Sequence, residues 1–78
     1  MELPSVEIAE MEALIPELRE LARGEFQLSE QDADDVVEMT LLRAASVKVQ
    51  RPENIGLSEW LRAIVREEAT LHLETLTH

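Results

Sequence analysis

The sequence has no cysteine and no tyrosine, and it holds only one tryptophan and one phenylalanine among its 78 residues. Without cysteine the chain has no disulfide and no thiolate to act as a nucleophile or metal ligand. A domain this small buries only about 60% of the surface that its unfolded chain exposes. Its stability must therefore come from core packing or from a partner.

The sequence also lacks a long apolar run and a basic-then-apolar leader, which would indicate a membrane span or a signal peptide. We therefore expect one domain over residues 1–78, located in the cytoplasm and without a membrane partner.

Groups that carry catalysis are scarce. His72 and His78 lack the spacing that places two metal ligands on one helix face, and no nucleophile is paired with a base. The acidic residues Asp32, Asp34 and Asp35 lack the glycine and distal glutamate of a calcium loop. We expect no enzymatic activity, no metal and no cofactor.

Positive charge is scarce as well, and it is unevenly distributed. The net charge is −10, and the first forty residues carry twelve carboxylates against two arginines, whereas the remainder is neutral. Phosphate backbones repel such a chain, so any DNA contact would have to be weak or made within a larger complex.

Hydrophobic periodicity predicts an all-α fold, a compact bundle of three or four helices. A first helix opens at Pro4 or Ser5, is kinked or divided by Pro16, and ends at a C-cap at Gly24.

The most regular amphipathic segment covers residues 32–47. Ser29 or Asp32 is its expected N-cap, and its apolar positions include the core candidates Val36, Val37 and Leu41.

Residues 48–57 are expected to form a loop, after which Ser58 caps a last helix. That helix supplies the core candidates Trp60, Leu61 and Ile64, together with Leu71 or Leu73.

The basic residues of the second half allow two interpretations. They could form a patch, whose members would be Arg43, Lys48, Arg51, Arg62 and Arg66. Alternatively, they neutralise the acids of the first half across helix contacts. We favour this second interpretation, because the excess acids must lie close to other side chains.

Three segments resemble one protein family. Residues 32–37 (Asp-Ala-Asp-Asp-Val-Val) and 40–44 (Thr-Leu-Leu-Arg-Ala) resemble region 2 of the extracytoplasmic-function sigma factors of bacterial RNA polymerase. Residues 14–23 resemble the first helix of that region, and residues 60–66 resemble its Trp-Leu-x-x-Ile-x-Arg segment. The resemblance spans about residues 13–68, with order and spacing kept.

The resemblance implies a helical domain whose central helix docks on the coiled-coil clamp of the polymerase β′ subunit. It places four residues on the partner-binding surface, for the clamp or for an anti-sigma protein: Asp35, Glu38, Met39 and Arg43. It also implies that the last helix and the preceding loop face the −10 promoter DNA, through Asn54, Arg62 and Arg66.

Departures from the family pattern occur at the functional positions. Glu38 and Met39 stand where the family has Gln-Glu, and Glu67 stands where it has Asn. These differences favour a sigma mimic that occupies an anti-sigma protein or another sigma partner. The alternative is a structural module that self-associates, for example as a homodimer, through Met39 and nearby apolar residues.

Overall fold

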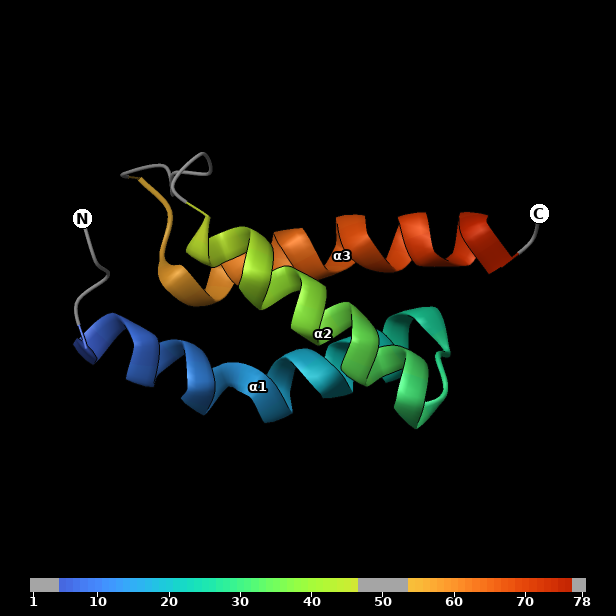
Figure 1. The fold of residues 1–78 in the computed structure, drawn as a ribbon, viewed down its shortest axis with the longest axis horizontal. Coiled ribbons are helices and arrows are strands. Elements are labelled where there is room, and N and C mark those ends of the chain that lie inside the picture. The colour runs from blue at the N-terminus through green and yellow to red at the C-terminus, as the bar shows by residue number, and fades with distance from the viewer. Residues whose placement is uncertain (1–4, 47–53, 77–78) are drawn as a thin grey trace.

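The computed structural model describes residues 5–46 and 54–76, and these fold into three helices without strands. The helices are α1 (Ser5–Phe26), α2 (Glu30–Ala45) and α3 (Leu57–Leu76). Each helix packs against both of the others, and α2 crosses diagonally between α1 and α3 (Figure 1). This confirms the predicted all-α bundle, with three helices.

Helix α1 is one helix that contains Pro16, so the alternative in which Pro16 divides it is wrong, and the helix also continues past Gly24. Pro16 lies inside the helix, and its side chain is exposed, so the carbonyl that loses its donor lies on the solvent side. The prediction of a C-cap at Gly24 is wrong, because α1 extends to Phe26 and no described glycine has a positive φ. Gln27, with φ of 53°, takes the left-handed conformation instead.

Helix α2 has caps at both ends. The Ser29 hydroxyl accepts a hydrogen bond from the Asp32 amide at 3.1 Å, which selects Ser29 as the N-cap. The helix therefore begins at Glu30, as the Ser29 alternative predicts. It ends at Ala45, with Ser46 as C-cap, two residues before the predicted end.

Helix α3 begins at Leu57, one residue before the predicted N-cap. The Trp60 amide donates to the Gly56 carbonyl at 3.0 Å, so Ser58 already lies within the first turn. The N-cap prediction for Ser58 is therefore wrong. Its hydroxyl donates instead to Glu17 of α1 at 3.1 Å. Residues 48–53, most of the predicted loop, lie outside the described residues, and they include the patch candidates Lys48 and Arg51.

The core is formed by aliphatic side chains from all three helices. Of the predicted core residues, Leu41 is only partly buried and packs at the edge, whereas the other five are buried: Val36, Val37, Trp60, Leu61 and Ile64. Thr40 is the one buried polar residue in the described part of the chain. Its hydroxyl donates to the Val36 carbonyl at 2.8 Å, so it is satisfied within its own helix.

None of the three described helices combines the length and apolar character required to cross a membrane.

Replacing Gly24 by alanine should raise the free energy of unfolding by about 0.5–1 kcal/mol. Gly24 is exposed within α1, its backbone is helical, and an added Cβ would meet nothing within 4 Å. Urea unfolding followed by circular dichroism measures the change. Ala13→Gly, at an exposed site of the same helix, is the matched reverse substitution and should lower stability by a similar amount. A loss of stability in Gly24→Ala would contradict the observed extent of α1.

Candidate functional site

The outer surface of α2 combines exposed apolar side chains with acids. Met39 and Leu42 are 52% and 61% exposed, one helical turn apart. Asp35 and Glu38 are exposed beside them, and neither contacts a basic side chain within the part of the chain that the structure describes. Three of the four predicted partner-binding residues therefore share the solvent-exposed part of α2.

Arg43, the fourth predicted partner-binding residue, is directed toward α3. Its Nη2 lies 3.2 Å from Glu67 Oε2, and its Nη1 lies 3.2 Å from Glu68 Oε1. Because one guanidinium joins two carboxylates of another helix, Arg43 acts in the structure as a cross-link between α2 and α3.

Two predicted DNA-facing residues, Arg62 and Arg66, contact acids of α1. Arg62 Nη2 lies 2.9 Å from Glu17 Oε2, and Arg66 donates from Nε and Nη2 to the two carboxylate oxygens of Glu25 at 3.4 and 3.2 Å. These contacts are those expected if the basic residues neutralise the acidic first half. Asn54, the third, is exposed just before α3.

Ion pairs of this kind join every pair of helices. Arg19 of α1 pairs with Asp34 of α2, which complements the α1–α3 pairs of Arg62 and Arg66 and the α2–α3 pairs of Arg43. All are at least partly solvent-exposed, so each contributes at most about 1 kcal/mol. Their main consequence is that four of the five described arginines are engaged within the molecule.

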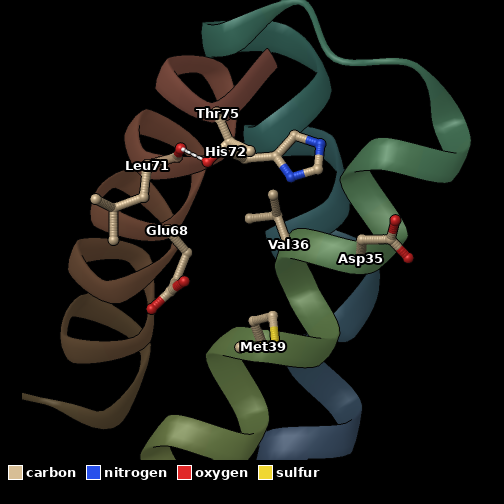
Figure 2. Close-up of a pocket in the computed structure, with 7 residues that line it drawn as sticks. All are labelled: Asp35, Val36, Met39, Glu68, Leu71, His72 and Thr75. Carbon is tan, nitrogen blue, oxygen red and sulfur yellow. Dashed lines mark hydrogen bonds between the residues drawn. The ribbon is translucent and has the colours of Figure 1, made fainter. Parts of the chain in front are cut away.

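A pocket of about 190 Å³ opens between α2 and α3 (Figure 2). We call it the α2/α3 groove. Figure 2 shows the His72 ring reaching from α3 toward α2 above Val36, with Met39 one turn further along α2. The lining residues are Asp35, Val36, Met39, Glu68, Leu71, His72 and Thr75.

His72 joins the two helices near one end of this groove. Its Nε2 lies 3.2 Å from Asp32 Oδ1 of α2. Within the described residues, no group of three or more side chains is placed to hold a metal ion.

Sequence reasoning missed the groove and the apolar residues around it. Leu71 was considered for the core, but it is 54% exposed, whereas Leu73 is partly buried against the core. The sequence did indicate that Leu42 is exposed, because Leu42 falls outside the apolar stripe of its helix. The position of His72 depends on how α2 and α3 cross, which the sequence pattern does not specify.

Glu17 receives two hydrogen bonds from α3. The Arg62 guanidinium, and after it the Ser58 hydroxyl, hold the pKa of Glu17 below its ordinary value. A carboxylate with a lowered pKa stabilises the fold above its ordinary pKa of 4.5, and this contribution is lost as the pH falls through the folded-state pKa.

Arg62→Gln should therefore raise the pKa of Glu17 toward its ordinary value, because the largest cause of the lowering is removed. Titration of the carboxyl carbon by NMR measures it. Arg66→Gln removes the same charge one turn away, but its partner is Glu25, so it should leave Glu17 nearly unchanged. An equal shift in both variants would mean that net charge, and not the contact, sets the pKa.

Comparison of the chain with models of known protein families, with curated proteins and with solved structures finds no match to any of them. The resemblance to sigma-factor region 2 therefore rests on the three sequence segments given above.

Proposed function

We propose that the chain is a sigma-factor region-2-like domain that acts in bacterial transcription through protein–protein contact. Its partner is either the β′ clamp of RNA polymerase or an anti-sigma protein. The observation that carries the proposal is the exposed pair Met39 and Leu42, next to the acids Asp35 and Glu38, which have no basic partner among the described residues. They lie on α2, the helix that resembles the polymerase-docking helix of the family. Polymerase works in the bacterial cytoplasm, so the proposal implies that location.

Direct DNA binding receives less support. A phosphate contact by Arg62 or Arg66 would compete with Glu17 or Glu25, the carboxylates that these arginines contact. Freeing either arginine would also leave an acid of α1 close to the phosphates, which is unfavourable. DNA contact is therefore proposed only as a weak contact within a polymerase complex.

Of the two protein partners, we favour the anti-sigma protein. Glu38 and Met39 depart from the family pattern, and both side chains are exposed on α2, where a partner would meet them. A domain that kept the core positions while changing the docking surface would still present a sigma-like shape. It would then occupy an anti-sigma protein without recruiting polymerase.

Self-association is the alternative function, and the exposed Met39 and Leu42 are the observation that favours it. A symmetric dimer through this surface would, however, bring Asp35 and Glu38 of the two copies close together. Sedimentation at several concentrations separates the two functions, because the proposed domain should remain a monomer in the absence of its partner.

Charge reversal at Glu38 tests the proposal. Binding of the chain to the clamp hairpin of β′, and to each anti-sigma domain encoded in the source genome, is measured by interferometry. Glu38→Lys should change the affinity for the true partner by about tenfold, because it alters a charge inside the docking surface. The proposal is contradicted if neither type of partner binds.

Glu12→Lys is the matched control, since Glu12 is an exposed acid on α1 and its reversal changes the net charge equally. It should leave the affinity within about twofold. Addition of a single-stranded −10 promoter fragment separates the two partners. Micromolar or tighter binding to the hairpin together with this DNA would rule out the mimic and support a polymerase-bound role.

A further inference from the structure

The α2/α3 groove is a preformed site whose ends are joined by polar contacts. Near the start of α2, His72 Nε2 lies 3.2 Å from Asp32 Oδ1. Near the end of α2, Arg43 contacts Glu68 and Glu67, each at 3.2 Å. These contacts span the two helices at both ends of the groove in the unbound chain.

The groove has an apolar part, while Asp35, Glu68, His72 and Thr75 supply a polar part of its lining. Val36, a buried core residue, contributes to its lining, with exposed Met39 and Leu71 on either side. A dry cavity of about 150 Å³ is known to accept a benzene molecule. The volume of the groove, about 190 Å³, therefore suits one leucine, methionine or phenylalanine side chain.

The large exposed apolar residues of the described chain cluster around this groove. They are Met39, Leu42 and Leu71: two line the groove, and Leu42 lies one turn beyond Met39 on α2. Such clustering marks a contact site more strongly than the same residues scattered over the surface would.

The charges around the groove determine the chemistry of its occupant. Asp35 lines it and Glu38 lies beside Met39, both without a basic partner in the described part of the chain. A second copy of this chain, with a net charge of −10, would place acids against acids. A basic segment would instead neutralise them. A helical segment suits a groove between two helices, because its side chains project at spacings of three and four residues.

We infer that the α2/α3 groove binds a single large apolar side chain from a positively charged amphipathic helix of a partner protein. Lysine or arginine residues one turn away on that helix pair with Asp35 and Glu38. This inference rests on the proposed function, because it specifies the chemistry of the protein partner. It assigns binding specificity to the shape and charge of the groove.

Selection from a display library of helices of about 16 residues tests this. Each helix carries any amino acid at its central position and either basic or acidic residues around it. The full-length chain is the bait. Leucine, methionine or phenylalanine should be enriched at the centre, and basic residues around it. Absence of binders, acidic flanks, or no apolar preference at the centre would overturn the inference.

Two matched substitutions then locate the bound side chain. Leu71→Ala removes a residue that lines the groove and should weaken the selected peptide about tenfold, whereas Leu42→Ala should weaken it less than about threefold. Both residues are exposed, so neither variant should unfold the chain. The methyl signals of Val36 and Met39 should shift on binding. Equal losses in the two variants, or unmoved methyl signals, would show a general apolar contact in place of insertion.

The outcome is separable from that of the proposed function. Peptide insertion without any clamp or anti-sigma binding would retain the groove and reject the sigma-like role. Clamp or anti-sigma binding that leaves the Val36 methyl signals unmoved would support the sigma-like role and reject side-chain insertion into the groove. Dimerisation of the chain that Leu71→Ala abolishes would overturn the basic helix as occupant, in favour of a second copy.

Discussion

The rest of the molecule depends on the burial of aliphatic side chains where the three helices meet. The largest fully buried side chains come from every helix: Leu18, Val36, Thr40, Leu61 and Val65. In proteins most of the stability of a helix comes from the packing of its apolar face, so each helix persists because the others cover that face. With 78 residues, the total stability is expected to be only about 4–12 kcal/mol. A single large cavity in this centre would remove much of it.

The packing of the helices also determines which charged side chains lie opposite one another. Once the apolar faces are buried, Arg62 and Arg66 lie opposite acids of α1, and Arg43 lies opposite acids of α3. These exposed pairs contribute little free energy individually. Their larger effect is on the surface, because arginines engaged within the molecule are not available to neutralise Asp35 and Glu38. Within the described residues, the outer face of α2 therefore combines acids that have no basic partner with exposed apolar residues. This combination is the basis of the proposed partner surface.

The sequence predicted the parts of the structure that depend on periodicity. The helical class and the buried positions Val36, Leu61 and Ile64 follow from apolar spacing. The residues used to predict where each helix begins and ends were less reliable. Gly24 is tolerated within an exposed turn of α1, while Ser58 forms a hydrogen bond with another helix in place of a cap. The groove could not be predicted, because it depends on the crossing of α2 and α3.

The pocket of mixed polar and apolar lining lies at that crossing. In Figure 1, α2 runs at an angle to α3, and the two ribbons separate toward the start of α2. Arg43 reaches Glu67 and Glu68 where the helices are close, whereas His72 extends to Asp32 where they have separated. The pocket that Val36 lines lies between the two helices. A partner side chain in this pocket would extend the core, so binding and folding stability would increase together.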